Sequence, residues 1–378
     1  MRIVFDATAL GGPNGKRGGI ENALWETFAR LHAMDGRNFT QACICADTPT
    51  DWPNDARWQW HRLPFDSSQK ARRICWQQFE LPQLLRRTNA DLLHAWNYVM
   101  PLVSPVPTIL TAQDLIALDH PRFARRANRL HYRALMPQSL KRAARVIVTT
   151  EQTRKAVLRR APGADVRVIP LGVAPEFSRT IAPAEVEAMR RKYDLPDKFL
   201  FYLGNFEPKK NLPNLLRALK LLPDAPPLVI AGGIAPWPNA EKLLRNVRQL
   251  GFVPRADVPT LLSACELFCF PSLCEGFGLP VLEALACGAP VIASSAVPLP
   301  DLESVALCPS PYSARAIADA ISRLLSDEAL RQKLSEAGRE YARGFGWDRA
   351  ARATLDLYQE FDSPGFDSER FDQREPSA

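Results

Sequence analysis

Short apolar runs alternate with longer segments whose apolar positions repeat at the period of a helix. In the first half we expect strands at residues 2–5, 41–45, 92–94, 108–111, 146–149 and 167–169, with helices notably at 21–32 and 153–160. In the second half we expect strands at 199–203, 228–231, 247–250, 267–270 and 291–293, and helices that begin near Leu212, Val258, Leu279 and Ala314. This alternation is typical of parallel sheets covered by helices, so it predicts two α/β units.

The same pattern sets the expected boundaries. We expect an N-terminal Rossmann-like domain at 1–173, a linker at 174–197 with one short charged helix, and a C-terminal Rossmann-like domain at 198–346. An amphipathic helix at 347–361 is expected to end the fold, and the polar residues 362–378 to form a mobile tail. With 378 residues, 46% of them hydrophobic, the chain is long enough for two cores of ordinary size.

Composition argues against several classes of protein. The sequence lacks a run of about 18 apolar residues, so it predicts no membrane-spanning helix. Its first residues form an expected strand that meets Asp6 at once, unlike a secretory signal peptide. The eight cysteines lack the paired spacing of metal sites, so we expect reduced thiols and a cytoplasmic protein.

The net charge of +7 is unevenly distributed, because residues 121–150 hold eight Arg or Lys and no acid. On a helix, one face of this stretch would carry Arg122, Arg126, Arg129 and Arg133, and its neighbouring face Phe123, Ala127, Leu130 and Ala134. A second basic and aromatic stretch contains Lys70, Arg72, Arg73, Trp76, Phe79, Arg86 and Arg87. Both stretches fit either solvated surface or peripheral contact with an anionic membrane, at about 1 kcal/mol per basic side chain. No recognition motif accompanies the charge, so we expect no nucleic-acid partner.

The most informative segment is residues 274–292, CEGFGLPVLEALACGAPVI. It predicts a glycine-containing loop, then a helix with Pro280 in its first turn and Gly288 at its end. Free backbone amides at a helix start bind anions such as phosphate. Glu275 in the loop and Glu283 about one turn into the helix can accept hydrogen bonds from the hydroxyls of a sugar or ribose. The segment therefore predicts a nucleotide-sugar site.

The two glutamates, with seven residues between them, resemble the Glu-x7-Glu motif of the retaining glycosyltransferases of family 4. Four other motifs occur in that family's order: Gly18-Gly19-Ile20, VIPLGV at 168–173, LGNFEPKKNL at 203–212 and LGFVP at 250–254. The resemblance implies the GT-B fold, in which two Rossmann-like domains face each other across a cleft and the C-terminal helix returns to the first domain.

The resemblance also implies roles for single residues. Glu275 would lie by the donor sugar, Glu283 would bind the ribose hydroxyls, and Lys210 would stabilise the charge that develops on the leaving diphosphate. The remaining expected donor contacts are Gly19, Asn205, Gly276, Phe277, Gly278 and Leu279. Paired carboxylates also suit a glycosidase, but there they flank the scissile bond and need no phosphate site. The glycine-rich loop at 11–19 fits either closure on the donor or a plain surface loop.

Two positions depart from the family's pattern. Gln113 stands where members commonly have a histidine near the donor sugar, and glutamine forms hydrogen bonds but carries no proton. Asn205 stands where members have a basic residue. We count Gln113 with Lys210 and Glu275 as catalytic candidates, although a structural role for Gln113 stays open. The candidates for the acceptor side are His94, Asn97 and Asp114, and His94 equally fits a core histidine.

The sequence thus predicts a retaining, metal-independent glycosyltransferase that needs no cofactor beside its nucleoside diphosphate sugar. The EPKKN form of the lysine motif resembles bacterial mannosyl- and rhamnosyl-type transferases and favours GDP-mannose; UDP-glucose or a UDP-N-acetylhexosamine is the alternative. A glycan or lipid-linked acceptor would fit cell-surface polysaccharide synthesis at the inner face of the cytoplasmic membrane. The rival is a nucleotide-sugar-binding protein without turnover, because Gln113 and Asn205 depart from the family.

Overall fold

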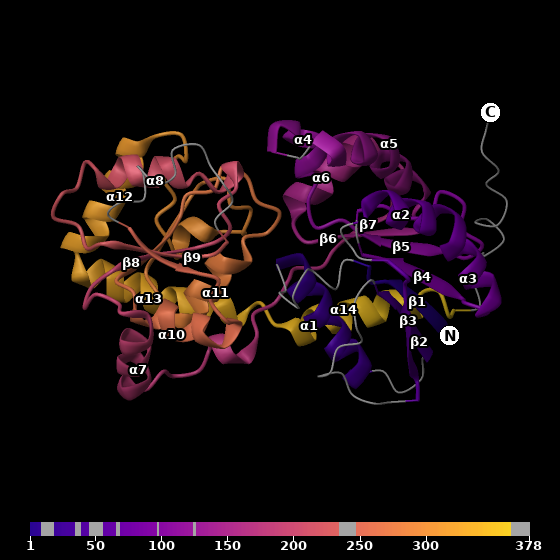
Figure 1. Ribbon diagram of the computed structural model, residues 1–378, viewed down its shortest axis with the longest axis horizontal. Coiled ribbons are helices and arrows are strands. Elements are labelled where there is room, and N and C mark those ends of the chain that lie inside the picture. Colours follow the sequence, from indigo (N-terminus) through magenta and orange to yellow (C-terminus); the bar gives the residue numbers. More distant parts are fainter. Residues whose placement is uncertain are drawn as a thin grey trace. The chain divides into compact units, whose positions relative to one another are not determined.

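The chain folds into two compact α/β units in the computed structural model (Figure 1). The first unit is Met1–Gly172 together with the chain from Trp347 onward, and the second is Val173–Gly346. The structure describes residues 1–8, 19–34, 39–44, 56–65, 69–96, 98–123, 126–233 and 247–363. The predictions on the loop at 11–18, on Asn97 and on most of the C-terminal tail therefore lie outside the described residues.

The described part of the first unit contains a seven-stranded parallel sheet with the order β3-β2-β1-β4-β5-β6-β7. Its strands are β1 (Arg2–Asp6), β2 (Phe39–Ile44), β3 (Trp58–Arg62), β4 (Leu92–Ala95), β5 (Thr108–Thr111), β6 (Arg145–Val148) and β7 (Val166–Val168). Six of these strands match the predicted ones within two residues. The prediction missed β3, an edge strand in which Trp58 is buried while Gln59 is exposed. Its apolar positions are too few to stand out from the polar sequence around it.

Helices connect these strands. They are α1 (Gly19–Met34), α2 (Lys70–Cys75), the π-helical η2 (Trp76–Glu80), α3 (Leu81–Arg87), α4 (Ile116–Asp119), α5 (Arg126–Arg142) and α6 (Glu151–Arg160), with the short η3 (Pro121–Phe123) before α5. Thr150 begins α6 because its hydroxyl accepts a hydrogen bond from the amide of Thr153.

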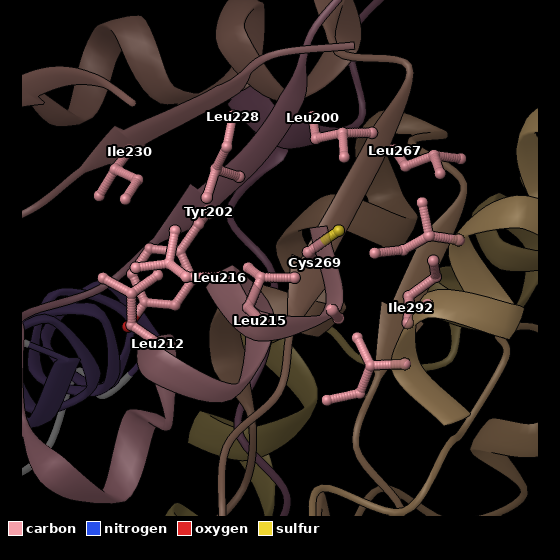
Figure 2. Packing of buried hydrophobic residues seen from close by; sticks show 14 of the residues in the cluster. Leu200, Tyr202, Leu212, Leu215, Leu216, Leu228, Ile230, Leu267, Cys269 and Ile292 are labelled. Carbon is pink, nitrogen blue, oxygen red and sulfur yellow. The ribbon is translucent and has the colours of Figure 1, made fainter. Parts of the chain in front are cut away.

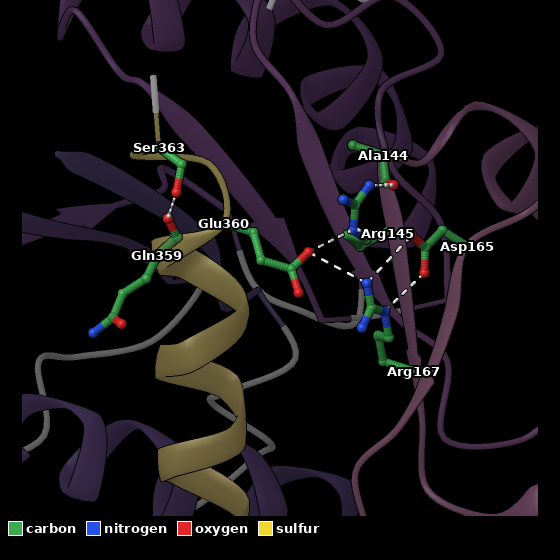
Figure 3. A network of polar contacts seen from close by, with 7 residues as sticks. All are labelled: Ala144, Arg145, Asp165, Arg167, Gln359, Glu360 and Ser363. Atoms are coloured by element: carbon green, nitrogen blue, oxygen red, sulfur yellow. Dashed lines mark hydrogen bonds and ion pairs between the residues drawn. The ribbon is translucent and has the colours of Figure 1, made fainter. Parts of the chain in front are cut away.

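The C-terminal helix α14 (Trp347–Gln359) packs along α1 in the first unit, as predicted. Trp347 and Tyr358 are almost fully buried at its two ends. Just beyond the helix, Glu360 accepts from Arg145 of β6 at 3.1 Å and from Arg167 of β7 at 3.3 Å (Figure 3). Apolar burial and this ion-pair network together fix the end of the chain to the sheet formed by its beginning.

The described part of the second unit contains a five-stranded parallel sheet with the order β10-β9-β8-β11-β12. Its strands are β8 (Leu200–Leu203), β9 (Leu228–Ala231), β10 (Arg248–Gly251), β11 (Leu267–Phe270) and β12 (Val291–Ala293). All residues of β9, β11 and β12 are buried, as expected for strands of a parallel sheet covered on both faces. Figure 2 shows part of the core that packs against this sheet, with Tyr202 beside Leu212 and Leu216.

The helices of this unit are α7 (Pro183–Tyr193), α8 (Leu212–Leu219), α10 (Val258–Ala264), α11 (Leu279–Cys287), α12 (Ala314–Ser326) and α13 (Glu328–Arg343). Four of them begin at the predicted residues. The short helix expected in the stretch 174–197 is α7, which packs against α10 and belongs to the second unit. Short η segments cover Pro175–Phe177, Pro208–Lys210, Arg255–Asp257 and Leu302–Ser304.

Candidate functional site

The loops that follow β8 and β11 meet at one edge of the second sheet. The two strands are parallel neighbours, so their carboxyl ends lie at the same edge, where ligands of α/β sheets bind. The backbone joins the loops directly, because the amide of Leu273 donates to the carbonyl of Lys209 at 2.7 Å. Asn211 adds two contacts from its side-chain amide, to the carbonyls of Pro271 at 3.0 Å and Pro311 at 2.7 Å. These bonds fix the position of Lys210 relative to Glu275.

Lys210 and Glu275 form a largely buried ion pair. The Lys210 Nζ lies 2.7 Å from Glu275 Oε1, and the two side chains are 14% and 9% exposed. The ammonium also lies 4.6 Å from the centre of the Phe270 ring, a favourable cation–π arrangement. Burial acts to raise the pKa of Glu275, but the charges of Lys210 and Lys209, the hydrogen bond from Lys210 and the nearby Ser272 hydroxyl together hold it below its usual value. The Glu275 carboxyl is therefore ionised at neutral pH.

The helix α11 begins beside Glu275 with a glycine that no other residue could replace without strain. Gly278 has φ +99°, and a Cβ at this position would lie 2.6 Å from Val297 Cγ1. No side chain caps the helix start. Within the described chain, the backbone amides of Phe277, Gly278 and Leu279 donate to no protein acceptor. An anion is stabilised at such an end by the amides and by the helix dipole.

Glu283 lies one turn into α11 and is almost fully buried. Its Oε1 lies 2.9 Å from Nη2 of Arg255, whose guanidinium stacks 4.7 Å from the Phe177 ring centre. Arg255 is not among the residues predicted for the site, although this arginine directly follows the LGFVP motif. The predicted contact of Glu283 with ribose hydroxyls stays a prediction, and in the fold this carboxylate forms an ion pair with Arg255.

Asn205 joins the loops after β8 and β9. Its Oδ1 accepts from the Gly233 amide at 3.1 Å, while the side chain remains exposed. The two loops pass so closely that a Cβ at Gly232 would lie 2.1 Å from the Gly204 carbonyl oxygen. An uncharged amide thus stabilises the loop where the resembling family carries a cation. Its contact with the donor stays a prediction.

Gln113 belongs to the first unit, just after β5. The side chain is 8% exposed, and its Nε2 has no hydrogen-bond partner among the residues that the structure describes. A buried amide without a partner is costly, and native proteins keep few of them. Gly19 lies at the exposed start of α1, where a Cβ would meet nothing within 4 Å. Their predicted contacts with the donor remain predictions.

The structure places His94 in the core, which is one of the two roles that the sequence left open for it. The residue is fully buried in β4, and its two ring nitrogens lie 2.6 Å from the Tyr358 hydroxyl and 2.7 Å from the Thr111 hydroxyl. Burial lowers its pKa to about 3, so the ring is neutral. Neither nitrogen is available to an acceptor, because both are used to join β4, β5 and α14.

Asp114 uses both carboxylate oxygens within the fold. One accepts from the amide of Ile116 at 2.9 Å and the other from the hydroxyl of Tyr98 at 3.2 Å. Tyr98 itself has φ +64°, so this bond helps to hold a backbone conformation that is uncommon for a bulky residue. The structure gives Asp114 a loop-stabilising role, and its contact with an acceptor stays a prediction.

Two absences concern only the residues that the structure describes. None of their helices combines the length and apolar character needed to cross a bilayer. Their His, Cys, Asp and Glu side chains form no group of three or more that could hold a metal ion.

Two family models match this chain, one in each unit. The model "Glycosyltransferase Family 4" matches residues 17–177, and "Glycosyl transferases group 1" matches residues 185–341. The O-antigen chain mannosyltransferase B of Escherichia coli is 35% identical over 47% of this chain and 50% of its own length. The E. coli serotype-specific mannosyltransferase WbdA is 29% identical over 67% of this chain and 33% of its own length. The matches therefore span half or less of these relatives.

Solved structures agree on the fold. A sucrose-phosphate synthase from Thermosynechococcus elongatus has a TM-score of 0.77 at 22% identity, covering 96% of this chain and 99% of that one. WaaG, a glycosyltransferase involved in lipopolysaccharide biosynthesis, has a TM-score of 0.73 at 17% identity, covering 94% and 99%. Since the two family models together account for most of both units, this chain belongs to the family-4 glycosyltransferases and has their GT-B fold.

Proposed function

We propose that this protein is a retaining glycosyltransferase that moves a hexose from a nucleoside diphosphate sugar to a glycan or lipid-linked acceptor. The observation that carries the proposal is the buried pair of Lys210 and Glu275 at the start of α11. A cation, a sugar-binding carboxylate and helix-start amides meet there, as a sugar diphosphate requires.

In this proposal Lys210 acts on the leaving group. The diphosphate gains negative charge as the glycosidic bond breaks, so a fixed ammonium stabilises the transition state more than the bound substrate. The amides of Phe277, Gly278 and Leu279 supply further positive potential at the same end of α11. We propose that these groups neutralise the diphosphate without a metal ion. Activity that survives a chelator would support this part, and activity that returns only with added Mg²⁺ would refute it.

Retention would follow the front-face course usually drawn for this family. The acceptor hydroxyl attacks the face from which the diphosphate leaves, and a phosphate oxygen takes the hydroxyl proton. The protein then contributes positioning and charge stabilisation rather than a nucleophile. The anomeric configuration of the product, read by NMR with an α-linked donor, tests this directly: an α-linked product supports retention, and a β-linked one refutes it.

We propose GDP-mannose as the donor. The EPKKN motif favours it, and relatives of this chain are named O-antigen chain mannosyltransferase B and serotype-specific mannosyltransferase WbdA. UDP-glucose or a UDP-N-acetylhexosamine is the alternative. The acceptor would then be a growing surface polysaccharide or its lipid-linked precursor, placing the protein at the cytoplasmic face of the membrane.

A basic and apolar surface of the first unit supports peripheral contact with that membrane. Phe79 of η2 is 69% exposed and Leu130 of α5 is 77% exposed. Burial lowers the pKa of His131 on α5, and the charge of Arg73 on α2 lowers it further, so the two helices are near each other. The basic residues of α2, α3 and α5 include Arg72, Arg73, Arg86, Arg87 and Arg133. Each would add about 1 kcal/mol of attraction to anionic headgroups. Sedimentation with phosphatidylglycerol vesicles, lost in Leu130→Ser and Arg133→Ser together, tests the contact; equal binding by both proteins refutes it.

The decisive experiment is release of nucleoside diphosphate from a panel of GDP- and UDP-sugars in the presence of membrane lipid extract. We expect release from one donor, about 100–1,000-fold slower in Lys210→Ala, the usual effect of removing one charge-stabilising group. Lys220→Ala is the matched control, because Lys220 is exposed at the end of α8 in the same unit. Donor binding without release, in wild type and control alike, would favour a binding protein that has lost turnover.

A further inference from the structure

Two buried hydroxyls beside the proposed donor site have no hydrogen-bond partner. Tyr202 of β8 and Ser272, two residues after β11, are fully buried, and neither hydroxyl oxygen has a partner among the described residues. Native proteins keep few such groups, because an unpaired buried hydroxyl has lost water and gained nothing. Both hydroxyls therefore call for an explanation.

Their positions relate them to Lys210 and Glu275. A Cβ placed on Gly204 would lie 3.5 Å from the Tyr202 hydroxyl oxygen and 3.9 Å from Cδ of Lys210, so the hydroxyl and the lysine stem approach the same point. Burial raises the pKa of Tyr202, and the negative charge of Glu275 raises it further. Figure 2 shows the Tyr202 ring beside Leu212, two residues after Lys210.

Ser272 lies in the same loop as Glu275, the loop between β11 and α11. It precedes Glu275 by three residues, and its hydroxyl helps to lower the pKa of that carboxyl although its geometry completes no hydrogen bond. In the free protein Glu275 has its close partner in Lys210, at 2.7 Å. The carboxylate is thus held by one cation and approached by two unused donors.

Donor binding changes this balance. If Lys210 turns toward the diphosphate, as the proposed function requires, its bond to Glu275 lengthens. A carboxylate that is 9% exposed cannot turn to bulk water for a replacement. A hydroxyl that already lies nearby and has no other partner can supply the hydrogen bond at no cost to the rest of the fold.

We propose that Tyr202 and Ser272 are positioning residues, which take over the Glu275 carboxylate when Lys210 turns to the diphosphate of the donor. This inference rests on the proposed function. The two hydroxyls are reserved for the bound state, so the free protein tolerates their missing partners. They also keep Glu275 ionised and oriented toward the sugar while Lys210 serves the leaving group.

The test uses the intact protein with GDP and UDP as probes. The variants are Tyr202→Phe, Ser272→Ala and the double variant. The control is Tyr341→Phe, because the Tyr341 hydroxyl already donates to the Pro300 carbonyl at 2.6 Å in the same unit. Titration calorimetry gives the affinity, and thermal unfolding of the free protein gives the stability.

We expect Tyr202→Phe to leave the unfolding temperature of the free protein unchanged or raised, since it removes an unpaired hydroxyl. Affinity for the nucleoside diphosphate should fall about tenfold, the effect of one hydrogen bond to a charged group. The control should behave in the opposite way, with lower stability and unchanged affinity. A fall in free-protein stability with unchanged affinity for Tyr202→Phe would overturn the proposal.

Proton uptake provides a second readout. With both hydroxyls removed, Glu275 in the complex loses its donors and its pKa rises, so binding at pH 6 should take up a proton. Calorimetry in buffers of different ionisation enthalpy detects this proton uptake. If the double variant takes up no proton, Lys210 must bind Glu275 and the diphosphate at the same time, and the proposal is overturned. Failure of wild type to bind any nucleoside diphosphate would instead refute the proposed function.

Discussion

Removing only the cation of the Lys210–Glu275 pair should destabilise the second unit more than removing both charges. Lys210→Met keeps most of the apolar stem but deletes the ammonium that lies 2.7 Å from Glu275. Breaking a buried ion pair from one side costs about 3–5 kcal/mol, because the other charge stays buried. We expect about 3 kcal/mol, since the Lys210 side chain keeps 14% exposure and water can reach part of the site. With Glu275→Gln added, the loss should shrink to about 1 kcal/mol.

The same variants should differ in their response to pH. In wild type the pKa of Glu275 lies below its usual value of 4.5. Its contribution to stability is therefore present above that value and is lost as the pH falls through the lower folded pKa. In Lys210→Met, burial is no longer opposed by Lys210, and the folded pKa rises. The variant should then lose less stability than wild type on acidification from pH 7 to 5.

Hydrogen exchange on peptides that cover β8 and β11 is the suitable assay. Tryptophan fluorescence would report mainly the first unit, because only Trp237 falls between Val173 and Gly346. Four proteins form the cycle: wild type, the two single variants and the double variant. Strict additivity of the two single losses, or an unchanged Lys210→Met, would refute the view that the pair is buried and coupled. Lys220→Met serves as the exposed control.

Three further predictions concern other parts of the fold. Gly278→Ala should lower stability by about 1–3 kcal/mol from backbone strain. Adding Val297→Ala should restore only the part of that stability lost to the 2.6 Å contact with Val297. Full recovery of the unfolding temperature would contradict the view that the positive φ of Gly278 causes strain. Arg255→Met should destabilise the second unit by about 3 kcal/mol, because it leaves Glu283 buried without its 2.9 Å partner, and Glu283→Gln should rescue most of the loss in urea unfolding. Burial lowers the pKa of His94 from 6.5 to about 3, so between these pH values the side chain binds a proton only in the unfolded protein. The free energy of unfolding should therefore fall as the pH drops below 6.5. His94→Gln should flatten that slope, and an equal slope in both proteins would disprove the buried neutral state.

The sequence by itself determined most of the strands, the main helices and the helix start at which we propose an anion site. Four strands of the second unit, β8, β9, β11 and β12, are continuous apolar runs, so their bounds could be placed within one residue. Proline and glycine fixed both ends of α11, because few other residues suit those positions. The exceptions are instructive: β3 is too polar to be recognised, and the separate helix α13 follows α12 without a strand between them.

Only the tertiary structure decided which side chains meet. Lys210 and Glu275 are 65 residues apart in the chain, and His94 is 264 residues from Tyr358. No local pattern signals such pairs, because the strand order of each sheet brings them together. The tertiary structure therefore moved His94 from the candidate acceptor contacts to the core. It also added Arg255, Tyr202 and Ser272 to the proposed donor site, since burial and missing partners depend on everything that packs around a group.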